Sequence, residues 1–283
     1  MSNLDIRVFE KRHDFLICID SDGTVIDAMS AKHNHCHGPA LIHVWHLEEY
    51  AKEVQSLWNT INLYSSTRGV NRFIALVIFL EKANGVYLRV DGLEKLKQWV
   101  ETSGNLSNEG LEEELKHHPD PMLQKALQWS YEINDRILML SHTDKPPYLG
   151  VKEFFDFAHG KVDIALISSS NMSALVEEWS NHNLIQYLDV LTSQEIGTKE
   201  ECVHQLIEKG YNPRHVLMIG DANPDLKAAT DNDTYFYPIL TQHEKESWDN
   251  LKDSYFKLFT SENYAEHQNS IIQKFKDNLS VNS

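Results

Sequence analysis

The segment Phe15-Leu16-Ile17-Cys18-Ile19-Asp20-Ser21-Asp22-Gly23-Thr24 is the most informative part of this chain about its fold. Five apolar residues that end abruptly in a carboxylate predict a buried parallel strand whose carboxyl end is a functional edge. Side chains two apart on an extended chain point to the same side, so Asp20 and Asp22 can converge, and Gly23 lets the backbone turn after them. Two such carboxylates repel each other unless a cation lies between them or one is protonated. The alternative is a strand followed by an ordinary Asp-Gly turn without a functional role. The rest of the chain distinguishes between these two interpretations.

Length and composition bound the class of protein. The 283 residues allow about two domains, and 42 acidic against 26 basic residues give a net charge of -16. This charge argues against general binding to nucleic acid or to anionic membranes, and it favours a bound divalent cation. The apolar run at 73–80 is too short to span a bilayer, and the polar N-terminus does not resemble a signal peptide. Three widely separated cysteines predict no disulfide framework, so a cytoplasmic location is expected.

Two sequence patterns follow the opening strand. Residues 29–147 show helical periodicity, for example Val54, Leu57, Trp58 and Ile61, and Pro146-Pro147 marks the exit from this block. From Gly150 onward, predicted strands at 162–167, 188–191, 215–219 and 234–239 alternate with helices. We therefore expect an α/β core of residues 1–28 and 148–283, a Rossmann-like three-layer fold with a parallel sheet, and an inserted all-helical domain of residues 29–147.

Polar side chains gather at the predicted strand ends. Besides Asp20 and Asp22, Ser168 follows the second strand, Lys199 precedes a helix, and Asp221 and Asp225 follow a later strand. Because the carboxyl ends of parallel strands share one edge, these side chains can meet in one crevice. Carboxylates suit a hard cation such as Mg²⁺, while a hydroxyl and an ammonium suit an anion such as a phosphoryl group.

These motifs resemble those of the haloacid dehalogenase-like superfamily. Its four motifs are matched in order by Asp20-Ser21-Asp22-Gly23-Thr24, by Ser168, by Lys199 and by Gly220-Asp221-Ala222-Asn223-Pro224-Asp225. The helical block between the first and second motifs is where that family places a type-one cap domain. The resemblance covers the core almost end to end, and its first and fourth motifs are the specific ones.

The resemblance implies a mechanism. Asp20 is expected to attack phosphorus and form an aspartyl-phosphate, and Asp22 to act as the general acid and then the general base. Mg²⁺ is expected on Asp20, the backbone carbonyl of Asp22, Asp221 and Asp225. Ser168, with Ser169 beside it, and Lys199 would hold the phosphoryl oxygens. A carboxylate at position 22 favours phosphate esters, because family members that displace halide lack one there.

Two segments of the helical block have competing interpretations. Residues 33–37 (His-Asn-His-Cys-His) invite a zinc site, but their spacing matches no zinc pattern, so we expect a polar hinge or a substrate-facing loop. The basic turn with Arg68 and Arg72 is similar to the loop with which sugar-phosphate mutases of this family grip a second phosphate. The alternative is a solvated helix start, although two arginines there oppose the helix dipole.

The predicted function is a Mg²⁺-dependent phosphatase that acts on a small phosphorylated metabolite, with no nucleic-acid or membrane partner. A phosphomutase is the alternative among enzymes, supported only by the basic turn. A binding or regulatory protein is the non-enzymatic alternative, although such a role would not require Asp20 and Asp22 together. The sequence determines neither the substrate nor the oligomeric state.

Overall fold

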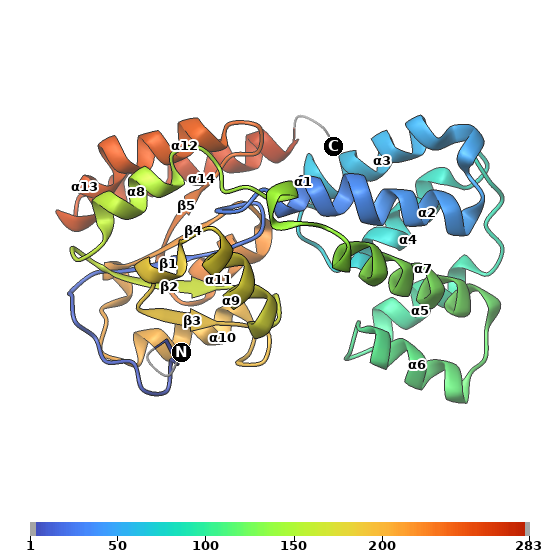
Figure 1. Cartoon of the computed structure of the whole chain (residues 1–283), viewed down its shortest axis with the longest axis horizontal. Helices are drawn as coiled ribbons and strands as arrows, with labels where there is room; N and C mark the ends of the chain where they lie inside the picture. Colours follow the sequence, from blue (N-terminus) through green and yellow to red (C-terminus); the bar gives the residue numbers. More distant parts are fainter. Residues whose placement is uncertain (1–3, 281–283) are drawn as a thin grey trace. The chain divides into compact units, whose positions relative to one another are not determined.

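The computed structural model describes residues 4–280, which form two compact units, each with its own hydrophobic core. Residues 4–29 and 142–280 make up the first, called the core unit, and residues 30–141 the second, called the helical unit (Figure 1). The insertion was expected at 29–147, so the return to the core unit begins a few residues earlier than the sequence suggested.

A five-stranded parallel sheet forms the centre of the core unit, in the order β3-β2-β1-β4-β5. The strands are β1 (Leu16–Ile19), β2 (Asp163–Ile167), β3 (Val190–Thr192), β4 (Val216–Gly220) and β5 (Tyr235–Pro238). The opening stretch is therefore the middle strand, fully buried as its continuous apolar run predicts. In register, Ile19 lies opposite Ile219 of β4 and Leu166 of β2, so the polar residues that follow these strands meet at one edge.

Helices cover both faces of the sheet, because alternate residues of each strand point to opposite sides. Ile17 and Ile19 of β1 belong to one apolar cluster, and Leu16 and Cys18 belong to another. The helices are α8 (Val151–Ala158), α9 (Met172–Asn181), α10 (Lys199–Ile207), α11 (Asn223–Asp231), α12 (Glu244–Asn250), α13 (Phe256–Thr260) and α14 (Ala265–Ser280), with a π-helical turn η6 (Leu251–Tyr255). α8, α9, α12 and α13 supply the first cluster, and α10 and α11 supply the second. The expected three-layer α/β core is confirmed.

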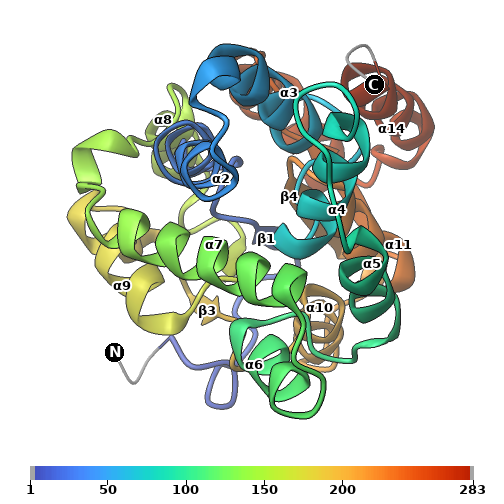
Figure 2. The same ribbon diagram turned by 90° about the vertical axis from the view of Figure 1, so that its right-hand side faces the viewer.

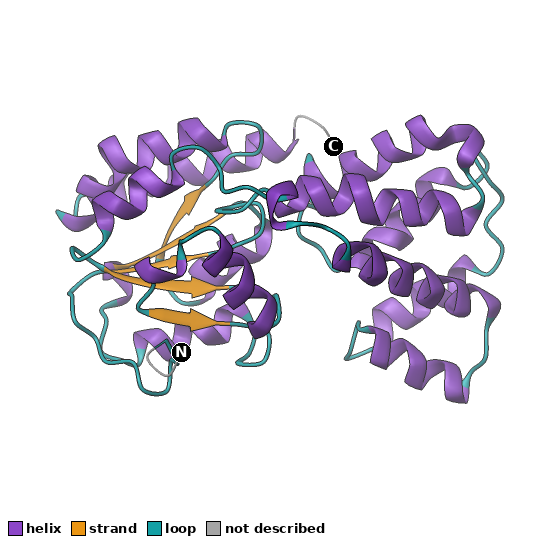
Figure 3. Cartoon of the chain, viewed as in Figure 1, coloured by secondary structure: helices purple, strands orange, loops and turns teal. Residues whose placement is uncertain are grey.

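The helical unit holds no strand among its described residues (Figure 3). It consists of α1 (Ala28–Lys32), which starts in the core unit, the π-helical turn η1 (His33–His37), α2 (Gly38–Trp45), α3 (Ala51–Leu63), α4 (Arg72–Ala83), α5 (Leu93–Thr102), α6 (Asn108–His117) and α7 (Pro121–Leu138). α7 packs against α2, α5 and α6 (Figure 2). Ser107 and Asp120 cap α6 and α7, because each side chain accepts from backbone N–H groups of the first turn.

The histidine-rich segment is helical, so the expected polar hinge or loop is wrong. α1, η1 and α2 follow one another without a break from Ala28 to Trp45. In the π-helical turn the rings of His33 and His37 stack with centroids 4.5 Å apart, and both side chains are buried. The polar histidines suggested an exposed segment. A neutral imidazole can nevertheless be buried where it has hydrogen-bond partners, and here only the folded unit supplies them. The partner of His33 is Trp58, whose indole N–H donates to His33 Nδ1 over 3.0 Å.

No helix among residues 4–280 combines the length and the apolar character that crossing a bilayer requires.

Candidate active site

Asp20 lies at the carboxyl end of β1, where the strand ladder ends. Its backbone N–H still donates to the Ile219 carbonyl of β4 over 3.0 Å, and its side chain is buried. The chain then turns sharply through Ser21, Asp22 and Gly23. Gly23 has φ +89°, a left-handed conformation that costs glycine little, and its N–H donates to the Ile26 carbonyl over 2.8 Å. Asp22 is half-buried in this turn.

Asp221 and Asp225 come from the neighbouring strand β4 and the start of α11. Asp225 is fully buried, and its Oδ2 accepts from the backbone N–H groups of Asp221 (3.1 Å) and Ala222 (3.0 Å). Gly220 makes room for this arrangement, because a Cβ there would lie only 2.2 Å from the Asp225 carboxyl carbon. Thr24 Oγ1 donates to Asp221 Oδ1 over 2.5 Å and so joins the first motif to the fourth.

Lys199 brings a positive charge to these carboxylates. It is the first residue of α10, whose start is fixed by a capping box between Thr198 and Glu201. Its Nζ lies 2.8 Å from Asp20 Oδ1 and 2.6 Å from Asp225 Oδ1, and its side chain is only 10% exposed. The ammonium therefore bridges two carboxylates that belong to different motifs.

The electrostatics of the cluster follow from burial and from mutual repulsion. Burial raises the pKa of Asp20, the nearby Asp225 and Asp221 raise it further, and Lys199 opposes them. The pKa of Asp225 is also raised, first by burial and then by Asp221, with Lys199 opposing. Burial alone would lower the pKa of Lys199, but its two carboxylate partners outweigh it and raise that pKa. Because one ammonium cannot neutralise three ionised carboxylates, either a bound cation or a proton on one of them relieves the remaining repulsion.

The donor set fits a divalent cation. Asp20, Asp221 and Asp225 each offer a carboxylate oxygen, all within 4.8 Å of one another, and all three residues are buried. Hard oxygen donors of this kind suit Mg²⁺, which binds one or two carboxylates and keeps several waters. The Asp22 side chain is not part of this set.

Ser168 lies on the same edge of the sheet, at the end of the neighbouring strand β2. It is buried, its backbone N–H donates to the Thr192 carbonyl over 3.3 Å, and its Oγ accepts from the Ser170 N–H over 3.2 Å. Ser169 is exposed. Ser168 thus follows β2 at the sheet edge that also carries Asp20, while Ser169 is exposed.

Arg68 and Arg72 are both held within the helical unit. Arg68 is buried and donates from Nη1 to the Leu63 carbonyl over 2.9 Å. Arg72 begins α4 and donates from Nη1 to Asn134 Oδ1 over 2.8 Å and to Ser130 Oγ over 3.1 Å. Burial lowers the pKa of Arg72. Neither is the solvated helix start that the simpler interpretation of the sequence described.

Several contributing residues were not singled out from the sequence. Thr24 is part of the quoted first motif but was given no role, although its hydroxyl holds Asp221. Two buried tryptophans contact the same turn: Trp179 Nε1 donates to Ser21 Oγ over 2.9 Å, and Trp248 Nε1 donates to the Thr24 carbonyl over 3.1 Å. These partners are 158 and 224 residues apart in sequence, so no local pattern could have found them.

Comparisons with known proteins agree with this arrangement. The sequence model of the haloacid dehalogenase-like hydrolases matches residues 16–233, which is more than half of the 283-residue chain. A search of curated proteins found no match.

Solved structures show likeness at low sequence identity. A subfamily IA hydrolase of that superfamily from Geobacter sulfurreducens is 16% identical, with 82% of this chain and 90% of that chain covered and a TM-score of 0.40. A predicted phosphoglycolate phosphatase from Haemophilus somnus is 13% identical (79% and 84% covered, TM-score 0.47). A Thermotoga maritima protein provisionally named beta-phosphoglucomutase is 16% identical (85% and 99% covered, TM-score 0.47). On the match of the family model, which spans all four motifs of the site, the chain belongs to the haloacid dehalogenase-like hydrolases.

Proposed function

We propose that the protein is a Mg²⁺-dependent phosphatase of small phosphorylated metabolites, and that Asp20 is its nucleophile. The observation that carries the proposal is the convergence of Asp20, Asp221, Asp225 and Lys199 within a few ångströms at one edge of the sheet. Three buried carboxylates beside one ammonium are costly to maintain for stability alone. They suit a site that takes up a cation and a phosphoryl group together.

In the proposed reaction an Asp20 oxygen forms a bond to phosphorus as the ester P–O bond breaks, which gives an aspartyl-phosphate. Asp22 donates a proton to the leaving oxygen and then removes one from the water that hydrolyses the intermediate. Lys199 and Ser168 hold the phosphoryl oxygens, where charge must be stabilised. Mg²⁺, held by Asp20, Asp221, the Asp22 carbonyl and Asp225 directly or through water, would neutralise charge on the transferred group when bound.

The other site assignments are part of the proposal. Residues 29–147 would act as the cap that selects the substrate, with Arg68 and Arg72 contacting it and Ser169 beside the phosphoryl group. Arg72 is half-buried and donates to the uncharged side chains of Ser130 and Asn134, which supports a role for its charge toward an anionic substrate. The three cysteines Cys18, Cys36 and Cys202 are free and buried, which supports the proposed cytoplasmic location.

A screen of phosphate esters tests the function. Wild-type protein, Asp20→Asn and the matched control Asp14→Asn, an exposed aspartate near the start of β1, are incubated with a metabolite panel and Mg²⁺. We expect wild type and Asp14→Asn to release inorganic phosphate and Asp20→Asn to lose about three orders of magnitude in rate or more. Turnover by Asp20→Asn equal to that of wild type, or no turnover by wild type on any ester, would contradict the proposal. Recovery of an isomerised ester in place of phosphate would identify a phosphomutase.

A further inference from the structure

Two buried indole groups donate hydrogen bonds to the turn that carries Asp22. Trp179 in α9 and Trp248 in α12 are fully buried. Trp179 donates to the side chain of Ser21, the residue before Asp22, and Trp248 donates to the backbone carbonyl of Thr24, two residues after it. The turn is thus tied at each end to a different helix of the core unit.

The turn is also closed upon itself. The Ser21 carbonyl accepts from the backbone N–H groups of Val25 (2.9 Å) and Ile26 (3.0 Å). Thr24 has a second contact, because its hydroxyl donates to Asp221 Oδ1 while its carbonyl accepts from Trp248. Fixing Thr24 therefore sets the positions of two carboxylates, Asp22 in the turn and Asp221 on the neighbouring strand.

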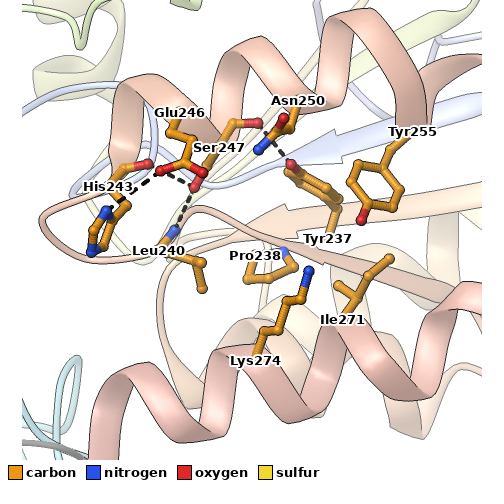
Figure 4. A pocket seen from close by; sticks show the side chains of 10 residues that line it. All are labelled: Tyr237, Pro238, Leu240, His243, Glu246, Ser247, Asn250, Tyr255, Ile271 and Lys274. Atoms are coloured by element: carbon orange, nitrogen blue, oxygen red, sulfur yellow. Dashed lines mark hydrogen bonds and ion pairs between the residues drawn. The ribbon is translucent and has the colours of Figure 1, made fainter.

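The helix that carries Trp248 is itself anchored to the sheet. Its other side lines a surface cavity of about 320 Å³, which Figure 4 shows from close by. There Ser247 Oγ accepts from the Leu240 N–H over 3.0 Å, and the Ser247 carbonyl accepts from the Tyr237 hydroxyl over 2.7 Å. On the inner side the Trp248 ring packs against Phe154, with centroids 5.2 Å apart. The indole N–H is therefore held in one orientation.

The backbone at Gly150 lies close to Trp248 and limits the movement of this side chain. A Cβ on Gly150 would lie 3.0 Å from Trp248 Cβ, and Gly150 has φ +94°. Trp248 lies outside residues 16–233, the segment that the family model matches. The contact to Thr24 is thus supplied by a part of this chain that the shared family sequence does not include.

We propose that Trp179 and Trp248 are positioning residues that hold Asp22 for proton transfer to the leaving oxygen. This inference rests on the proposed function. In that step the ester P–O bond breaks as the Asp20 oxygen bonds to phosphorus, and the leaving oxygen takes the Asp22 proton. An alkoxide needs this proton, whereas p-nitrophenolate is stable enough to leave without it. Loss of a positioning hydrogen bond must therefore slow alkyl phosphates much more than p-nitrophenyl phosphate.

Matched variants separate the effect of the indole hydrogen bonds on the position of Asp22 from the effect of the indole rings on core packing. Trp179→Phe and Trp248→Phe remove the N–H donor and part of the ring. Replacing Trp248 by 3-(3-benzothienyl)alanine keeps the bicyclic shape and substitutes sulfur for N–H, so it answers the question even where the Phe variant folds poorly. Trp129→Phe is the control, because Trp129 is equally buried and donates its N–H to the His37 carbonyl over 3.3 Å within the helical unit.

Turnover is measured with Mg²⁺ on p-nitrophenyl phosphate and on the best alkyl phosphate from the screen. We expect the variants at 179 and 248 to lose about 10- to 100-fold in kcat/KM on the alkyl ester and less than about threefold in kcat/KM on p-nitrophenyl phosphate. The ratio kcat/KM reports the steps up to the aspartyl-phosphate, so it leaves out the later activation of water by Asp22 that both esters share. Amide hydrogen exchange of residues 21–26 should accelerate in the same variants. Trp129→Phe should show neither effect.

The outcomes are distinguishable from failure of the proposed function. No hydrolysis of either ester by wild type overturns the proposed function and this inference with it. An active wild type, combined with equal losses on both esters or with no loss, overturns the inference alone. The inference is also overturned if the benzothienyl variant matches wild type in leaving-group dependence and in exchange of residues 21–26.

Discussion

The ammonium of Lys199 contacts two carboxylates of the cluster, and it has two tasks there. It lies between Asp20 and Asp225, and so it lowers the repulsion among groups that are almost completely buried. In the proposed reaction it also attracts the phosphoryl group to an anionic nucleophile. Because both tasks depend on the same charge, removing that charge should affect stability and catalysis together.

We predict that Lys199→Met lowers the free energy of unfolding by about 3 kcal/mol at pH 7 without divalent cations, since breaking a buried ion pair leaves its partners uncompensated. Turnover should fall by about 10²- to 10³-fold. Urea unfolding and steady-state kinetics measure the two effects. The control is Lys227→Met, an exposed lysine on α11 that bonds Glu200 and Asp231 and should leave both quantities unchanged. Equal behaviour of the two variants would contradict the role assigned to Lys199.

The π-helical turn η1 buries two histidines, His33 and His37, and thereby lowers the pKa of both. A π-helical turn has more than four residues per turn, so residues four apart stack almost directly, as His33 and His37 do. Burial lowers the pKa of His37 to about 3, and a hydrogen bond from its Nδ1 to the Lys32 carbonyl opposes this only in part. The pKa of His33 is lowered too, first by burial and then by the positive charges near it.

These shifts predict acid sensitivity of the fold. The folded state binds the His37 proton only near pH 3, whereas the unfolded chain binds it near 6.5. Stability is therefore fully present above about pH 6.5 and is lost as the pH falls toward 3. His37→Gln should reduce the slope of unfolding free energy against pH by about 1.4 kcal/mol per pH unit between pH 6 and 4.

Chemical denaturation at several pH values measures that slope. His35→Gln is the matched control, because His35 lies in the same turn but is exposed, and its slope should equal that of wild type. An unchanged slope in His37→Gln would show that His37 is not buried as a neutral ring.

The carboxylates proposed to bind Mg²⁺ belong to the core unit, and the helical unit has a hydrophobic core of its own. The carboxylates lie entirely within the core unit, at the ends of β1 and β4 and the start of α11, whereas the helical unit has its own apolar cluster. A ligand that binds only the native state stabilises the part of the molecule that holds it. Binding of Mg²⁺ should therefore be visible in one unit and not in the other.

We predict that Mg²⁺, added without substrate, slows amide exchange near residues 16–26 and 216–226 and raises the thermal midpoint. Asp221→Asn should abolish both effects, because it removes one of the three convergent carboxylates. Asp231→Asn, which changes a half-exposed aspartate at the end of α11, should retain them. Hydrogen-exchange mass spectrometry with and without EDTA makes the comparison. Protection in residues 30–141 alone would place the cation elsewhere.

Much of the fold was predictable from short sequence patterns. The apolar runs that end in polar residues became β1, β2 and β4, because a strand buried on both faces must be continuously apolar. The stripe through Val54, Trp58 and Ile61 became the buried face of α3. The failure at His33–His37 has a specific cause: polar residues suggest exposure until their hydrogen-bond partners, here Trp58 and the Lys32 carbonyl, are known.

The parallel α/β core, the helical insertion and the motif residues at the strand ends can all be predicted from the sequence. These follow from hydrophobic periodicity and from the rule that parallel strands share one functional edge. Three contacts become visible only in the folded chain: Lys199 bridges Asp20 and Asp225, Thr24 donates to Asp221, and two indoles donate to the turn around Asp22. The reason is that each of these contacts joins segments far apart in the chain, and contacts at such separations leave no periodic trace in the sequence.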